Sequence, residues 1–470
     1  MKVEQLFTGC LAEMAYYIHS NGEAAIIDPL RETEPYIEMA KADGVKIKYV
    51  FLTHFHADFV SGQVDLAKKT GATIVFGPNA NPNYNIHQGK DGETFKIGDI
   101  TLKLLHTPGH TMESSSYLFI DKDGNTPYVF TGDCLFIGDV GRPDLAVKSD
   151  VTQDDLAGHL YDSLRNKIMT LPDDTIVYPN HGAGSACGKN MSSETFDTLG
   201  NQKKTNYALR ADMTKEEFIK EVTTGLKPAP QYFGNNVRMN KGINTSIDEI
   251  LKRGTTPIDA DTFKEMSEQK DILVIDTRTK EIYAEEGTVP GAWYIGVEGG
   301  FAPWVGALVK DINQKIIFIA EEGREQEVVI RLSRVGYDNT LGYLRGGIHS
   351  WKAAGHKVDK IGSISAMQFA KKLTDENIVA LDVRKESEYL SEHVVGVENF
   401  PLDYIHSNFA EIKPDKEYFL HCASGYRSLI AASIFMANGV KNVTDVRGGF
   451  NDIKDTGVKL TDYVCPTTLL

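Results

Sequence analysis

The second half of the chain contains an internal repeat, and this repeat constrains the fold more than any other feature of the sequence. One copy begins ILVIDTRTKEIYAEEGTVPGA at Ile272, and the other begins IVALDVRKESEYLSEHVVGV at Ile378. Their second halves read KIIFIAEEGREQEVVIRLSRVGYDNTLGYLRGG from Lys315 and EYFLHCASGYRSLIAASIFMANGVKNVTDVRGG from Glu417. A period of about one hundred residues indicates a duplicated domain rather than a solenoid. Each copy is predicted to run strand, helix, strand, tight loop, helix, strand, as in a small α/β domain with a parallel sheet.

The first part of the chain, to about Asn206, has a different pattern in which strand-like apolar runs alternate with helical ones. The strand-like runs include AAIIDPL, KYVFLTHF, ATIVFGP, TLKLLHTPGH and PYVFTGD, and polar residues follow several of them. Residues 153–169 are predicted to form a helix that buries Leu156, Leu160, Leu164 and Ile168. We therefore expect a layered α/β domain here.

The chain of 470 residues is too long for one hydrophobic core, so several domains are expected. The periodicity fails in a passage rich in Pro, Gly and Asn, KPAPQYFGNNVRMNKGIN, which marks a boundary. We predict domains at residues 1–240, including a helical connector, and at 255–356 and 361–465 for the two repeats.

Charge and cysteine content argue against several classes of protein. The 65 acidic and 50 basic residues give a net charge of -15, which disfavours nucleic acid as a partner because such binding needs clustered Lys and Arg. No apolar run is long enough to span a bilayer and no signal peptide is evident, so we expect a cytoplasmic protein without a membrane partner. The five cysteines are odd in number and scattered, which predicts free thiols rather than a disulfide framework.

Four clusters of metal-binding residue types occur in order in the first domain. They are THFHAD with His54, His56 and Asp58, TPGHT with His110, TGDC with Asp133, and YPNHG with His181. Such side chains, on short loops after strands, can converge on one ion although they are far apart in sequence. One His-x-His-x-Asp alone is a weak signal, because evenly spaced histidines are often structural, but four ordered clusters predict a metal site.

The order of these clusters resembles the metallo-β-lactamase superfamily, whose motif is Thr-His-x-His-x-Asp-His. The resemblance implies an αββα fold for the first domain. The chain departs from the motif at Phe59, where hydrolases of the superfamily such as glyoxalase II have a ligand for a second metal. A phenyl ring cannot coordinate a metal, so the departure predicts a site for one ion rather than two.

The members of this superfamily with one iron are the persulfide dioxygenases, also called sulfur dioxygenases, and the resemblance to them implies His54, His110 and Asp133 as ligands. Two histidines and a carboxylate with open positions suit one mononuclear Fe(II) ion that must also bind dioxygen and a substrate atom. Whether His56 or His181 also touches the metal stays open. The residues expected to orient the ligands by hydrogen bonds are His56, Asp58 and His181.

Two residues near these clusters have two interpretations each. Arg142, in GDVGRPDL, matches the family's Gly-Arg pair and could clamp the carboxylate of a thiol carrier such as glutathione, or form a structural ion pair with Asp139 or Asp144. Cys187 could relay sulfur, or be a buried and inert cysteine.

The last repeat places Cys422 directly after an apolar strand and before a helix, in HCASGYRS. Backbone N–H groups of such a loop and the helix amino terminus favour a thiolate, so we predict a nucleophile. The segment LDVRKESEYLSEHVVGVENFPL, the loop from Cys422 to Arg427 and VRGGF strongly resemble the rhodanese domain, a sulfurtransferase. The resemblance implies Cys422 and Arg427 as catalytic residues, and the short loop favours sulfur transfer over the phosphate hydrolysis of related phosphatases.

The earlier repeat has Ala320 opposite Cys422 and Glu325 opposite Arg427. Without a thiol it cannot carry sulfur, so it resembles an inactive rhodanese whose role is packing or domain placement.

The domain order resembles a fusion of a persulfide dioxygenase with an inactive and an active rhodanese. This implies O2-dependent oxidation of a persulfide of glutathione, coenzyme A or bacillithiol to sulfite, and sulfur transfer through Cys422 between persulfide, sulfite and thiosulfate. Related enzymes form dimers or tetramers, so a homo-oligomer is expected. Two alternatives stay open: a zinc-dependent thioester hydrolase of the glyoxalase II kind that carries rhodanese modules, and a sulfur-carrying adaptor without turnover.

Overall fold

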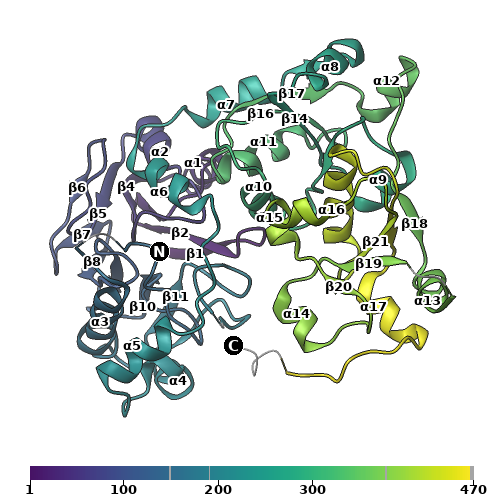
Figure 1. Ribbon diagram of the computed structural model, residues 1–470. Helices are drawn as coiled ribbons and strands as arrows, with labels where there is room; N and C mark the ends of the chain where they lie inside the picture. The colour runs from purple at the N-terminus through teal and green to yellow at the C-terminus, as the bar shows by residue number, and fades with distance from the viewer. Residues whose placement is uncertain (148–149, 190, 376–377, 466–470) are drawn as a thin grey trace. The chain divides into compact units, whose positions relative to one another are not determined.

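The computed structural model describes residues 1–147, 150–189, 191–375 and 378–465 (Figure 1). The chain forms two compact units. The first comprises Met1–Ile247 with the short segment Ser333–Gly336, and the second comprises the chain from Asp248 onward without that segment. None of the helices among the described residues is long and apolar enough to cross a bilayer.

The first unit is built around two six-stranded sheets. The first sheet, in the order β1-β2-β3-β4-β5-β6, contains β1 (Lys2–Thr8), β2 (Glu13–Ser20), β3 (Glu23–Ile27), β4 (Lys46–Phe51), β5 (Thr73–Phe76) and β6 (His87–Gln88). The second, in the order β12-β11-β10-β9-β8-β7, contains β7 (Thr94–Ile97), β8 (Ile100–His106), β9 (Ser115–Ile120), β10 (Tyr128–Gly132), β11 (Ile176–Pro179) and β12 (Asp197–Thr198).

The side chains of strand β2 pack into two different hydrophobic clusters, one on each face of the first sheet. Met14, Tyr16 and Ile18 belong to the cluster between the two sheets. Ala15 and Tyr17, which point to the opposite face, pack with residues of α1 (Glu34–Ala42) and α2 (Gln63–Thr70). Because side chains alternate along a strand, the apolar run from Met14 to Ile18 buries residues on both faces of the sheet. Helices cover its outer face, and the predicted αββα layering is confirmed.

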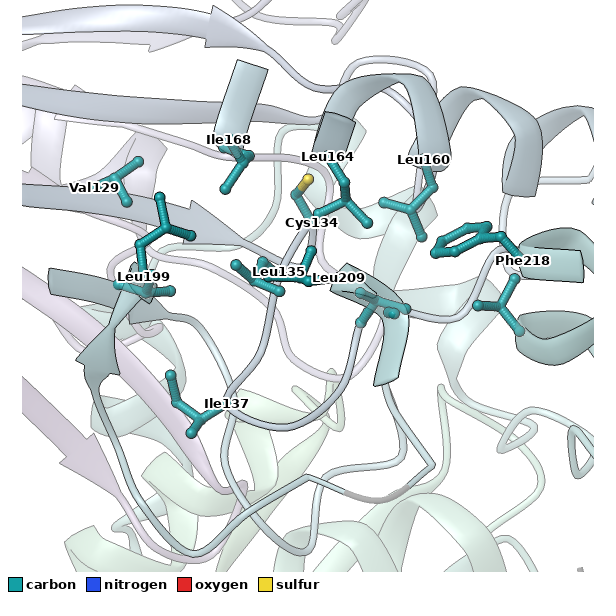
Figure 2. Packing of buried hydrophobic residues seen from close by; sticks show 14 of the residues in the cluster. Val129, Cys134, Leu135, Ile137, Leu160, Leu164, Ile168, Leu199, Leu209 and Phe218 are labelled. Atoms are coloured by element: carbon teal, nitrogen blue, oxygen red, sulfur yellow. The ribbon is translucent and has the colours of Figure 1, made fainter. Parts of the chain in front are cut away.

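A third core cluster covers the outer face of the second sheet, and Figure 2 shows part of it. The predicted helix begins at a capping box formed by Thr152 and Asp155 and runs as α3 (Gln153–Ser163). It then widens into a π-helical turn at Leu164–Ile168, which the leucine spacing did not indicate. All four predicted core residues of this segment are buried, and Leu160, Leu164 and Ile168 belong to this cluster. The remaining helices of the first unit are α4 (Leu199–Thr205), α5 (Lys215–Thr223) and α6 (Phe233–Lys241).

The second unit contains two five-stranded parallel sheets with the same strand order, which confirms two small parallel-sheet domains. The first sheet, in the order β13-β17-β16-β14-β15, contains β13 (Pro257–Ile258), β14 (Ile272–Asp276), β15 (Trp293–Tyr294), β16 (Lys315–Ile319) and β17 (Thr340–Leu344). The second, in the order β18-β22-β21-β19-β20, contains β18 (Gly362–Ile364), β19 (Val379–Asp382), β20 (Glu398–Asn399), β21 (Tyr418–His421) and β22 (Val443–Val446). The limits 255–356 and 361–465 stay predictions.

The helices of the two repeats also correspond. The first repeat follows α7 (Ile247–Gly254) and has α8 (Ala260–Ser267), α9 (Lys280–Glu286), α10 (Phe301–Leu308), α11 (Glu325–Arg334) and α12 (Gly347–Ala353). The second has α13 (Ala366–Asp375), α14 (Glu386–Ser391), α15 (Ile405–Asn408), α16 (Tyr426–Ala437) and α17 (Gly449–Ile453). In the central pairs of strands, Asp276 lies opposite Ile319 and Asp382 lies opposite His421. The next residues, Ala320 and Cys422, therefore occupy the same position in the two repeats.

Candidate metal centre and thiol loop

The predicted metal-binding residues of the first unit follow the carboxyl ends of four strands, β4, β8, β10 and β11. The structure brings most of them together in two buried groups, each with ligand atoms within 4.8 Å of one another. The first group is His54, His110 and Asp133, and the second is Asp58, His181 and Cys187.

Asp133 is the centre of the first group. Its Oδ2 lies 3.4 Å from His110 Nε2 and 3.9 Å from His54 Nε2. Among the described residues, neither oxygen of this buried carboxylate has a hydrogen-bond partner. A buried charge without a partner is costly, and a divalent cation between these three side chains would remove that cost. The residues therefore fit a metal ion.

Hydrogen bonds fix the tautomers of both histidines. His110 Nδ1 donates to the carbonyl oxygen of Arg142 at 2.9 Å, so Nε2 keeps its lone pair. Thr53 donates its hydroxyl proton to Asp28 and accepts from His54 Nδ1 at 3.0 Å, which leaves the Nε2 lone pair of His54 free in the same way. Burial and the neighbouring imidazoles lower the pKa of His54 well below its ordinary value, which keeps the ring neutral as a metal ligand must be.

Asp28, which the sequence analysis did not select, organises the residues behind this group. Its carboxylate accepts hydrogen bonds from Thr53 N at 2.8 Å, from Asn180 Nδ2 at 2.7 Å and from His56 Nε2 at 2.9 Å. The only signal in the sequence was its position directly after an apolar strand, which it shares with the predicted ligands. His56 thus uses Nε2 to bind Asp28, keeps a buried Nδ1 without a partner, and belongs to neither group.

Phe59 is fully buried, and its ring stacks on the imidazole of His56 with centroids 4.3 Å apart and planes at 28°. The side chain that replaces a histidine of the motif is therefore packed as a hydrophobic residue beside the site. Its backbone oxygen accepts a hydrogen bond from Asn240 Nδ2.

The second group adjoins the first through Asp133. His181 Nε2 lies 3.4 Å from Asp58 Oδ2 and 3.6 Å from Asp133 Oδ1, and His181 Nδ1 donates to the Ala12 carbonyl at 3.2 Å. Burial raises the pKa of the Cys187 thiol well above its ordinary value, and the carboxylates of Asp58 and Asp133 add to the shift. Without a cation beside it, this thiol is protonated at neutral pH.

Glu13 is a second residue near the site that the sequence analysis did not select. Both oxygens of its buried carboxyl lack a partner. Burial raises the pKa of Glu13 well above its ordinary value, with contributions from the charges of Asp58 and Asp28. Glu13 therefore avoids a buried charge by keeping its proton, and it belongs to neither candidate metal group.

Arg142 forms the ion pair with Asp144 that was one of its two predicted roles. Its guanidinium binds both oxygens of Asp144, at 2.6 and 2.7 Å, and donates to the Lys227 carbonyl at 2.6 Å and the Ala186 carbonyl at 3.3 Å. These contacts occupy most of its donors, so a carboxylate clamp for a thiol carrier would first have to displace Asp144. The residue instead contacts the centre through its backbone, whose oxygen orients His110.

In the second unit, Cys422 lies at the end of β21 with 1% of its surface exposed. Its sulfur accepts a hydrogen bond from Gly425 N at 3.1 Å and one from Ser428 Oγ at 3.6 Å. Arg427, at the start of α16, forms a double hydrogen bond with Glu388 of α14, at 2.6 and 2.8 Å. Donors directed at the sulfur stabilise an anion there, as a thiolate nucleophile requires.

Comparisons with known proteins assign both halves of the chain. A model of the metallo-beta-lactamase superfamily matches residues 8–181, and a model of the rhodanese-like domain matches residues 259–354 and 365–456. The chain is also similar to a metallo-beta-lactamase structure from Staphylococcus aureus, with 29% identity, a TM-score of 0.63, and coverage of 73% of this chain and 98% of that one.

Two relatives of the first half have different activities. Human mitochondrial persulfide dioxygenase ETHE1 is 28% identical over 249 residues, which are 52% of this chain and 89% of that protein. The probable hydroxyacylglutathione hydrolase glo2 of Schizosaccharomyces pombe is 34% identical over 178 residues, 37% of this chain and 64% of the hydrolase. One relative is thus an oxygenase and the other a hydrolase.

Proposed function

This chain belongs to the metallo-beta-lactamase superfamily in its first half and carries two rhodanese-like domains after it, and from this premise we propose a bifunctional enzyme of sulfide oxidation. In the first reaction, a low-molecular-weight thiol persulfide, dioxygen and water give the thiol, sulfite and two protons. In the second, sulfite takes the outer sulfur of another persulfide by way of Cys422 and leaves as thiosulfate. Both reactions balance without a further reductant.

The observation that carries the first reaction is the group around Asp133. It offers two imidazole nitrogens with fixed lone pairs and one carboxylate, all buried. One ion of Fe(II) held by His54, His110 and Asp133 would supply the redox chemistry that dioxygen needs. Asp28, through Thr53, keeps His54 in the tautomer that binds metal.

The loop around Cys422 supports the second reaction. The Gly425 N–H and the Ser428 hydroxyl donate to the sulfur, and the same donors would stabilise a persulfide anion on the cysteine. Sulfite produced at the first site is then consumed at the second, and the covalent link raises its local concentration. The carrier thiol could be that of glutathione, coenzyme A or bacillithiol, and a homo-oligomer in the cytoplasm is our expectation.

The test is a metal assay on protein purified without added metal, combined with oxygen uptake on glutathione persulfide. We expect iron at one equivalent and oxygen consumption that H110A abolishes. H106A is the matched control, because His106 lies at the end of β8 four residues earlier and binds the Met112 carbonyl instead of the group around Asp133. Iron-loaded protein without persulfide-dependent oxygen uptake would refute the proposal.

A zinc thioester hydrolase remains the second candidate because Asp58, His181 and Cys187 retain donors for another ion beside Asp133. It predicts two equivalents of metal, loss of one of them in C187S, and turnover of S-lactoylglutathione. One equivalent of iron that C187S leaves unchanged, together with oxygen uptake, decides against it.

A further inference from the structure

The first three carbonyl groups of the Cys422 loop are bound from outside the loop. Phe450 N, in α17, donates to the Cys422 carbonyl at 2.6 Å, and Asn451 N donates to the Ala423 carbonyl at 3.1 Å. The third carbonyl, that of Ser424, accepts instead from Lys280 Nζ at 2.9 Å. Lys280 does not belong to this repeat, because it is the first residue of α9 in the repeat that lacks the thiol.

The Ser424 carbonyl and the Gly425 N–H belong to one peptide group. A trans peptide is planar and its C=O and N–H point in opposite directions, so a group that holds the oxygen outward also directs the N–H inward. This N–H is the one that donates to Cys422 Sγ at 3.1 Å. The ammonium of Lys280 also polarises the peptide, and hydrogen bonds in series strengthen one another.

The first repeat holds the next residue of the loop as well. Tyr426 donates its hydroxyl proton to the Gly296 carbonyl at 2.6 Å. A Cβ atom on Gly299 would lie 2.2 Å from the Tyr426 ring, so only glycine lets the ring pack there. Further along α16, the Ser433 hydroxyl accepts from Tyr294 N at 2.8 Å. The first repeat therefore contacts both the loop that carries the thiol and the helix that follows it.

We propose that Lys280 of the thiol-free repeat is a positioning residue for Cys422: it holds the Ser424–Gly425 peptide so that the Gly425 N–H stabilises the anionic sulfur of the thiolate or the persulfide. The inference rests on the proposed role of Cys422 as a sulfur carrier. It gives the first repeat a part in the chemistry of the second, beyond packing. Lys280 itself is partly exposed, with 38% of its side chain accessible, so its replacement should not disrupt the core.

The test compares the full chain with K280M, which keeps the apolar stem, and with K280R, which restores a cation. The rate of Cys422 alkylation by iodoacetamide is followed against pH by mass spectrometry of the Cys422 peptide, without any sulfur substrate. We expect the midpoint of this profile to move up by about one pH unit in K280M and to return most of the way in K280R. The kcat of sulfur transfer from thiosulfate to cyanide at pH 7 should fall about tenfold in K280M.

The other charged groups near the sulfur are not replaced in these variants, although the charge of Lys280 also lowers the pKa of Asp445. They are His421, Arg427 with Glu388, Asp382 with Arg384, and Asp445 with Arg447. K264M is the control, because Lys264 lies on α8 of the same repeat and pairs with Glu268 at 2.5 Å. It should leave the alkylation profile and the kcat unchanged.

An alkylation midpoint in K280M equal to that of the unmodified chain would refute the inference, even if kcat fell, since Lys280 would then act on the substrate instead. Failure of the proposed function looks different. In that case the unmodified chain transfers no sulfur, while the alkylation profiles still decide the role of Lys280.

Discussion

The two repeats of the second unit have the same strand order, but only the second has a cysteine in the loop after its central strand. Each has a buried ion pair at 2.6 Å at the end of the corresponding strand, Asp276 with Arg278 at the end of β14 and Asp382 with Arg384 at the end of β19. Each also has a glycine with positive φ three residues after the Ala320 or Cys422 position. Only one repeat has a thiol there. The comparison teaches that the loop conformation is set by local backbone requirements, which persist where the reactive group is absent.

The surroundings of the two loops differ as well as the residue at their centre. In the first repeat the loop residue Glu321 uses its carboxylate to accept from Thr279 N, and Glu322 and Glu325 add negative charge. In the second, the corresponding region has Ser428 directed at the sulfur and Arg427 beside it. An acidic loop repels a sulfur anion, so a cysteine alone would not convert the first repeat into the second.

Of the changes that separate the two repeats, replacement of Cys422 by serine should have the largest effect on activity. Sulfur transfer from thiosulfate to cyanide should fall at least about a thousandfold, because the nucleophile is lost. With a persulfide substrate, oxygen uptake should continue and sulfite should accumulate in place of thiosulfate. The matched variant A320S should change neither. Loss of oxygen uptake in C422S would show that the two sites are not separate.

Asp445 in the second repeat occupies the position of Tyr343 in the first. We expect Asp445 to make the stability of the chain depend on pH, which is the second-largest effect. Burial raises the pKa of Asp445 from 3.8 to about 6. Because the folded chain then binds the proton more tightly than the unfolded chain, this group lowers stability as pH rises from about 4 to about 6, and the loss persists above. D445N should therefore be more stable at pH 7 by about 3 kcal/mol and equal to the unmodified chain near pH 4.

Urea unfolding followed by tryptophan fluorescence measures this difference, since all three tryptophans lie in the second unit. Y343F is the control and should show no such pH dependence. A D445N variant with the same stability gap at pH 4 and pH 7 would contradict the assigned titration.

Replacement of the two loop glycines by alanine should have the smallest effect on stability, and it compares equivalent positions of the two repeats. Gly323 has φ 86° and Gly425 has φ 94°, and an added Cβ would find no atom closer than 4.0 Å at either position. The cost of alanine is therefore conformational, about 1 kcal/mol of unfolding free energy in each case. G425A should also slow sulfur transfer because it tilts the N–H directed at Cys422, whereas G323A should not. Equal effects on activity would mean that the first loop takes part directly.

The sequence alone determined the features that depend on local pattern. The duplication predicted two parallel-sheet domains, and the alternation of strand-like runs with helical ones predicted the layered first domain. Four ordered clusters of His and Asp predicted a metal site, the family resemblance implied His54, His110 and Asp133 as its ligands, and the structure places these three in one group. Such signals are readable because strand and helix periods lie within a few neighbouring residues.

Only the tertiary structure decided which distant side chains meet. Asp28 binds Asn180 across 152 positions, and Lys280 binds the Ser424 carbonyl across 144. The sequence left Arg142 compatible with a substrate clamp or an ion pair, and the fold brings its guanidinium onto the carboxylate of Asp144. Hydrogen bonds of this kind depend on distances that packing sets to within a few tenths of an ångström, and neighbouring residues in the chain do not encode those distances.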